Sequence, residues 1–317
     1  MKNTNSIFNS VSTELKYQVY SHVLTVVLII SIALSIVNLY GLMKKADSSY
    51  TLYLKTYAGY EQQGMDVEEM LKAPLSVDKT GHLEMIDNPI RYNYEETASA
   101  LRLLKSENIM TQTLEWMSFI FFPLIFALYG IYISAYDYKY RTIKAKIVRT
   151  RWDKLLTAKL LSLYLSGLFI ILCTLAVSYA ASFWFYQQVV EHIPVEQFSH
   201  AELPPAKNVV PQFLLSIGAS FLFATIGFIL GLLFRGFAVP MIIFFVYDLI
   251  VPVLGAYDIR NLIAVIAHEL FDFKGRFQLF TPLPVPSFAA IALLFVAFII
   301  SLAGSYLLFL RQGKYTS

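Results

Sequence analysis

Continuous apolar stretches, rather than alternating ones, dominate the pattern of hydrophobic and polar positions along this chain. A helix needs about 20 apolar residues to cross the hydrocarbon core of a bilayer. Lipid offers the backbone no hydrogen-bond partner, so a spanning segment is either a helix or a strand of a closed barrel, and continuous stretches favour helices. The pattern predicts six transmembrane helices, over Val23–Met43, Trp116–Tyr136, Leu160–Tyr186, Val209–Phe234, Phe237–Tyr257 and Pro286–Leu310.

An amphipathic pattern precedes the first of these segments. Ile7, Phe8, Val11, Leu15 and Val19 recur at spacings of about four among polar residues, which is typical of one face of a helix. The pattern predicts a short helix that lies on the inner membrane surface. The alternative is a simple N-terminal extension of the first span.

The segments between the apolar stretches differ in character. Residues 44–113 are polar and rich in acidic side chains, and we expect them to form a small external subdomain. Residues 187–208 form a second external loop. Residues 258–285 are mostly apolar, yet they are too short and too charged for a span with its turns. We expect a re-entrant or interfacial external hairpin there.

The composition agrees with a membrane protein, since 57% of the residues are hydrophobic and only 15% are charged. Soluble domains carry about a quarter charged residues. The one cysteine, Cys173, excludes an intramolecular disulfide. The first 22 residues lack an apolar stretch followed by the small residues of a cleavage site, and the first apolar stretch is about 20 residues long, which favours a retained span over a signal peptide.

Basic residues set the orientation. Eight Lys and Arg lie within residues 139–159, between two predicted spans. Loops rich in Lys and Arg stay in the cytoplasm. Placing both termini and this segment inside gives the inside an excess of basic residues and the outside an excess of acidic ones. The predicted fold class is therefore an all-α polytopic membrane protein of six transmembrane helices, N-in and C-in.

Apolar side chains interrupt the basic segment, and their projection covers more than half of a helix circumference. This breadth favours two short helices with a break near Arg149–Arg151, packed against protein, over one helix lying on lipid headgroups. Binding of anionic headgroups stays open as the alternative. Nucleic acid is not expected, because the patch is short and belongs to no recognisable binding module. The apolar side chains are Ile143, Ile147, Val148, Trp152, Leu155 and Leu156.

A family resemblance begins at residues 137–144, DYKYRTIK, followed by a basic stretch and Lys159 at the start of the third span. In order and motif this resembles the permease (transmembrane) subunit of ABC-2-type ABC transporters, whose corresponding junction reads as an acid, a few residues, Gly-Thr-Ile-Lys and a basic turn. The chain departs from that pattern in three places. Asp137 replaces the usual Glu, Arg141 replaces the Gly, and no Pro follows near Thr150.

The resemblance implies a single transmembrane domain over residues 1–317, in which a cytoplasmic coupling segment over 137–159 docks on a separate ABC ATPase subunit. The chain has no P-loop (G-x-x-x-x-G-K-[ST]), so we expect no catalysis and no cofactor in it, with ATP and Mg²⁺ held by the partner. Among the docking candidates, Arg and Trp are the residues that dominate interface hot spots. The docking candidates are Thr142, Ile143, Lys144, Ile147, Arg149, Arg151 and Trp152.

The implied function is that of an ATP-driven exporter in a bacterial cell (plasma) membrane. It would work with membrane lipids around it and with a second permease copy or a sister permease beside it. Its cargo would be amphipathic: a peptide, an antibiotic or a lipid-like molecule. A non-transport membrane sensor or immunity protein with an external ligand-binding loop is the alternative. A carrier coupled to protons or ions through Asp248 is a third class.

Three further features lie in or near the apolar segments. Asp248 is an intramembrane carboxylate and a candidate for the transport path, with a purely structural role as the alternative. Gly227 and Gly231 form a G-x-x-x-G pattern that predicts close helix packing, within the chain rather than between copies. His268-Glu269 lacks the second His of a zinc motif, since position 272 is Asp, so no metal site is expected.

Overall fold

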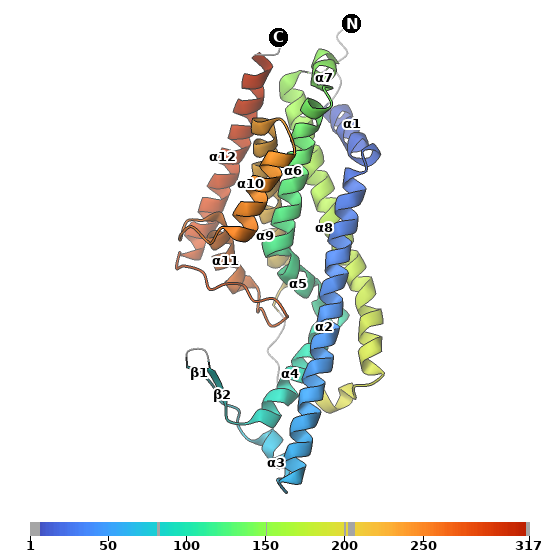
Figure 1. Cartoon of the computed structure of the whole chain (residues 1–317), viewed down its shortest axis with the longest axis vertical. Helices are drawn as coiled ribbons and strands as arrows, with labels where there is room; N and C mark the ends of the chain where they lie inside the picture. The colour runs from blue at the N-terminus through green and yellow to red at the C-terminus, as the bar shows by residue number, and fades with distance from the viewer. Residues whose placement is uncertain (1–6, 81–82, 150, 200, 202–206, 315–317) are drawn as a thin grey trace.

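The computed structural model describes residues 7–80, 83–149, 151–199, 201 and 207–314, and it is a helical membrane protein (Figure 1). Five helical stretches in this part of the chain are long and apolar enough to cross a membrane. Together they confirm a multi-pass, all-α architecture. The five stretches are α2 (Val23–Gln62), Ser106–Lys139, α8 (Trp152–Val190), α9 (Val209–Phe234) and α12 (Ser287–Lys314).

The second stretch is three joined elements: α5 (Ser106–Trp116), the π-helical turn η1 (Met117–Phe121) and α6 (Phe122–Lys139). Pro123 lies in the first turn of α6, where its missing N–H costs least. The π-helical turn before it accommodates the proline without ending the helix.

Two of the spanning helices are much longer than the apolar stretches that predict them. The 40 residues of α2 extend about 60 Å at 1.5 Å per residue, twice the hydrocarbon thickness. The 39 residues of α8 are almost as long. α2 continues as a largely polar helix after its apolar stretch, and α8 extends beyond its apolar stretch at both ends, over 152–159 and 187–190, so helix ends here do not mark membrane boundaries.

The fifth predicted span, over 237–257, requires a correction. Its helix is short: α10 (Ala238–Phe245) continues as the π-helical turn η3 (Val246–Ile250) and then stops. Val251 is extended, with φ −72° and ψ 126°, because Pro252 disfavours the helical region for the residue before it. The helical part is about 20 Å long, less than the thickness of the bilayer core.

The segment predicted as an external hairpin, 258–285, contains the helix α11 (Ile259–Leu270) and an irregular return to α12. Asn261 joins its two ends. The amide donates to the carbonyl oxygens of Ala256 at 2.8 Å and Leu283 at 3.1 Å, and it accepts from the Leu283 N–H at 2.8 Å. One buried side chain therefore closes the segment into a loop.

A small subdomain lies beyond one end of the bundle (Figure 1). It contains α3 (Val67–Lys72), an antiparallel hairpin of β1 (Val77–Thr80) and β2 (Leu83–Ile86), and α4 (Pro89–Leu104). Its core includes side chains from the far halves of α2 and α8 and from the short helix η2 (Val195–Phe198). The predicted segment 44–113 thus shares its core with residues 185–198.

The opposite end of the bundle carries α1 (Ile7–Tyr20), α7 (Ile143–Arg149) and the last turns of α12 (Figure 1). We call it the α7 end. α1 packs along α8 and turns into α2 at His22, which has a left-handed φ of 59°. α7 is separated from α8 at Arg151, which is extended, so the break predicted near Arg149–Arg151 is confirmed.

Candidate functional site

The helix α1 turns a polar face inward. Glu14 and Gln18 are spaced by four residues, so they share one face of the helix, and their exposed fractions are 5% and 3%. From the apolar stripe, Ile7, Phe8 and Val19 are exposed, whereas Val11 is buried. α1 thus buries two polar groups together with one apolar side chain and leaves other apolar side chains outward, where they are suited to a membrane surface.

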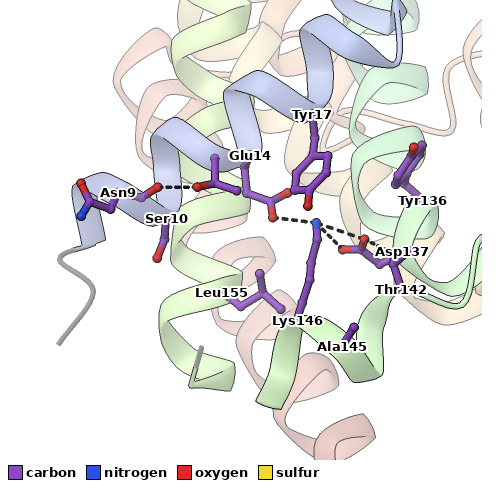
Figure 2. A pocket seen from close by; sticks show the side chains of 11 residues that line it. Asn9, Ser10, Glu14, Tyr17, Tyr136, Asp137, Thr142, Ala145, Lys146 and Leu155 are labelled. Atoms are coloured by element: carbon purple, nitrogen blue, oxygen red, sulfur yellow. Dashed lines mark hydrogen bonds and ion pairs between the residues drawn. The ribbon is translucent and has the colours of Figure 1, made fainter. Parts of the chain in front are cut away.

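Glu14 belongs to a charge network of two carboxylates and two ammonium groups, contributed by α1, α6, α7 and α8. Lys146 Nζ lies 2.8 Å from Glu14 and 3.1 Å from Asp137, between the two carboxylates (Figure 2). Lys159 Nζ lies 2.7 Å from Asp137 and 3.7 Å from Glu14. The formal charges of the four groups cancel, which is how buried charges are tolerated.

Hydrogen bonds extend this network into the bundle. Lys159 also donates to the carbonyl oxygen of Ile133 at 2.8 Å. The Gln18 oxygen accepts from Tyr129 and Ser166, both at 2.5 Å, while its nitrogen donates to Ser162 at 2.9 Å. The polar layer therefore fixes α1 against both α6 and α8.

A cavity of about 490 Å³ opens beside the network at the α7 end (Figure 2). Its lining combines α1, α6 and α7, and its charged groups are Glu14, Asp137 and Lys146. The Lys146 ammonium also lies 4.3 Å from the centre of the Tyr17 ring. The three charged groups of the lining sum to one negative charge, and Lys159, which is paired to both carboxylates but is not part of the lining, balances it.

The turn before α7 keeps the conformation that glycine would favour. Arg141 has a φ of 57°, in the left-handed region, although it is not glycine. Thr142 closes the turn: its N–H donates to the Asp137 carbonyl oxygen at 3.0 Å and its hydroxyl to the Asp137 carboxylate at 2.6 Å. The departure from the family pattern at this position does not remove the turn.

The docking candidates divide into exposed and inward-facing groups. Lys144 and Arg151 are exposed, and Arg151 pairs with Asp153 at 3.0 Å. Ile143 is buried in the main core. Thr142 is half-buried. Trp152 is half-buried too, with its ring 4.7 Å from that of Phe309 in α12.

The side chains of the remaining two candidates, Ile147 and Arg149, lie outside the described residues, although their backbone belongs to α7. Among the docking candidates, the described charges that face outward are therefore Lys144 and Arg151.

The glycines of α9 confirm the prediction of close packing within the chain. A Cβ on Gly227 would meet the backbone of Ala127, and one on Gly231 would meet Ser134 and the Ile131 carbonyl oxygen. Gly130 of α6 makes the reciprocal approach to α9. The glycines therefore allow α6 and α9 to pack with their backbones in contact.

Asp248 lies in the π-helical turn η3. One of its carboxylate oxygens, Oδ2, is buried and has no hydrogen-bond partner in the structure. Asp248 lines a second cavity, which has a volume of about 430 Å³. No cluster of three or more His, Cys, Asp and Glu able to hold a metal occurs in the described ranges.

Sequence reasoning missed the charge network as a unit. Asp137 and Lys159 belong to the family-like motif, but nothing indicated that Glu14 and Lys146 would join them. The available signal was the spacing of Glu14 and Gln18, which places two polar groups on one side of the helix, next to Val11 of its apolar stripe.

No family model, no curated protein and no solved structure matches this chain. The interpretation of its sites therefore depends on their own geometry and chemistry.

Proposed function

We propose that this protein is the membrane-spanning subunit of an ATP-driven exporter of the ABC-2 type, with the segment 137–159 docking on a separate ATPase subunit. The chain forms the path for cargo and carries out no chemistry. ATP and Mg²⁺ bind to the partner. Two such membrane subunits, identical or not, would work together in a bacterial cell membrane.

The observation that carries the proposal is the attachment of the short basic helix α7. Lys146 of α7 is ion-paired to Glu14 of α1 and to Asp137 of α6, and Asp137 is paired to Lys159 of α8. A push on α7 would therefore reach three other helices through paired charges. Lys144 and Arg151 remain exposed for a partner. Energy supplied from outside the chain agrees with the missing P-loop.

The test is co-expression with candidate ATPase subunits, purification of the complex, and uptake of amphipathic compounds into inverted vesicles. We expect one ATPase to co-purify and uptake to require ATP hydrolysis by that subunit. A variant of the ATPase that binds but cannot hydrolyse ATP is the matched control, and it should form the complex without uptake.

Two results would contradict the proposal. Failure of every ATPase to co-purify would favour a sensor or immunity protein, whose ligand the external subdomain would bind. Uptake that persists without ATP but collapses with the proton gradient would favour an ion-coupled carrier.

A further inference from the structure

The second cavity lies away from the α7 end, where η3 and α11 meet the α5–α6 helix. It has a volume of about 430 Å³, within the range of small-molecule sites. Residues 277–280 from the return loop line it, together with Phe223 of α9 and Ser118, Phe119, Ile120 and Pro123 from the α5–α6 helix. The cavity therefore combines elements that are far apart in sequence.

Asp248 is the unusual group in this lining. Its Oδ2 is buried and lacks any hydrogen-bond partner in the structure. A buried carboxylate without a partner is costly, and in an apolar segment it marks a functional site by default. The uncharged polar side chains in the lining are Ser118 and Gln278, and Ser118 is already bonded to Ser216 at 2.5 Å.

Arg260 also lines the cavity, but its charge is already matched. Its guanidinium donates to Asp258 at 2.8 Å and to the carbonyl oxygens of Tyr247, Val251 and Pro252 at 2.7–2.9 Å. Asp258 is ionised: burial acts to raise its pKa, but hydrogen bonds from Arg260 and the Leu254 N–H outweigh this and hold the pKa at about 2. The pair is neutral overall, so an ionised Asp248 leaves one negative charge uncompensated.

The rest of the lining is suited to an apolar cation. Phe119, Phe223, Phe277 and Phe280 line the cavity, and the rings of Phe119 and Phe277 are stacked with an interplanar angle of 3°. Aromatic faces attract cations, most strongly where water is excluded. Apart from Arg260, no basic side chain of the described residues lines this cavity.

We propose that this cavity is a binding site for a hydrophobic monocation, with Asp248 as its counter-charge and the phenylalanine rings as its walls. The cation replaces the missing hydrogen-bond and charge partner of the carboxylate. The return loop 277–280 covers the bound molecule.

If the bound cation is the cargo, the inference rests on the proposed export function and narrows the expected amphipathic cargo to cationic molecules. As a statement about binding, it needs no ATPase. The experiment therefore uses the chain without any partner, so that failure of this site and failure of the export function are distinguishable.

The test is equilibrium dialysis of labelled tetraphenylphosphonium against the full chain in nanodiscs of neutral lipid, with empty nanodiscs subtracted. We expect saturable binding at one site per chain. Asp248→Asn keeps the shape but removes the charge, and it should weaken binding by about tenfold or more. Tetraphenylborate has the same shape and the opposite charge, and it should show no saturable binding.

Two further variants separate the site from general effects. Val253→Trp fills the cavity and leaves Asp248 in place, and it should abolish binding. Asp272→Asn removes a half-exposed carboxylate of the same return loop, paired to Lys207 at 3.1 Å and not part of the lining, and it should leave the affinity within about twofold.

Folding is checked by gel filtration and thermal unfolding. Asp248→Asn should unfold at the same temperature as the wild type or higher, because it removes an unpaired buried charge. The proposal is overturned by equal affinity of a folded Asp248→Asn variant, by equal binding of tetraphenylborate, or by no saturable binding to the wild type.

Discussion

The side chain of Lys159 is only 2% exposed, and its ammonium group lies within 4 Å of two carboxylates. Removing one partner of such a network leaves the others buried and uncompensated, which costs more than the pair itself contributes. Lys159 therefore stabilises the α7 end chiefly because its loss would leave the buried carboxylates without a sufficient counter-charge.

We predict that Lys159→Met lowers the free energy of unfolding by about 3 kcal/mol or more. Adding Asp137→Asn to this variant should recover part of the loss, because the two side chains share one ion pair. Denaturant or thermal unfolding in detergent measures both. Lys144→Met, on an exposed lysine of the same segment, is the control and should change stability by less than about 0.5 kcal/mol.

A second prediction concerns Arg141, which adopts a left-handed φ of 57°. A non-glycine residue in that region carries about 1 kcal/mol of strain. Arg141→Gly should therefore stabilise the protein by up to about 1 kcal/mol, whereas Arg141→Ala, which keeps the Cβ, should not. A lower unfolding temperature for the glycine variant than for the alanine variant would show that the turn is not strained.

A third prediction follows from the ion pair between Asp258 and Arg260. The pKa of Asp258 is about 2 in the folded chain, against about 3.9 for an unperturbed Asp. The stabilisation is therefore fully present above about pH 4 and is lost as the pH falls towards 2. The difference in unfolding temperature between wild type and Asp258→Asn should be constant above pH 4 and shrink below it. A difference that grows with acidity would contradict the assignment.

The close contact of α6 and α9 is set by backbone approach at Gly130, Gly227 and Gly231. The G-x-x-x-G spacing predicts such an approach and was correctly assigned to packing within the chain. The spacing does not identify the partner helix, because a stripe of small residues can pack against any helix of matching shape. The role of Gly130 was missed because a single glycine in an apolar stretch forms no G-x-x-x-G pattern.

We predict that Gly227→Ala destabilises the protein by about 2 kcal/mol, because the new methyl group meets the backbone of Ala127. Gly218→Ala is the matched control on the same helix, since a Cβ there has open space around it. It should be neutral or slightly stabilising, as alanine favours helix. Equal effects of the two variants in thermal unfolding would rule out close packing at Gly227.

Helices were easier to predict than their ends. Hydropathy located every long apolar helix, but it could not show that α2 continues as a helix far beyond its apolar stretch, where it packs on α8 and on α4. The fifth span was overextended to 257, although Pro252 was visible in the sequence. Tertiary packing sets the length of the long helices, whereas the backbone restriction before Pro252 sets the end of η3.

At the scale of the molecule, the two candidate sites lie towards opposite ends of the bundle, and long helices connect them. The charge network joins α1, α6, α7 and α8 at the α7 end. The second cavity is formed where α6 begins, next to η3 and α11. The helix α6 thus carries Asp137 of the network at one end and Pro123 of the cavity lining at the other.

The sequence predicted a basic coupling segment from charge and a family-like motif, but its position depends on contacts that no linear pattern contains. Glu14 and Lys146 are 132 positions apart and meet at 2.8 Å. Asp248 was recognised as unusual from the sequence alone, whereas its cavity required the return loop to fold over it.

The measurement that tests the central claim most directly is ATPase binding by a charge-reversed coupling segment. Lys144→Glu with Arg151→Glu alters only exposed side chains, and Lys16→Glu on the exposed face of α1 is the matched control. We predict that the double variant folds normally, binds the ATPase at least about tenfold more weakly and loses ATP-dependent uptake, while the control keeps both. Unchanged ATPase binding and uptake by the folded double variant would contradict the account.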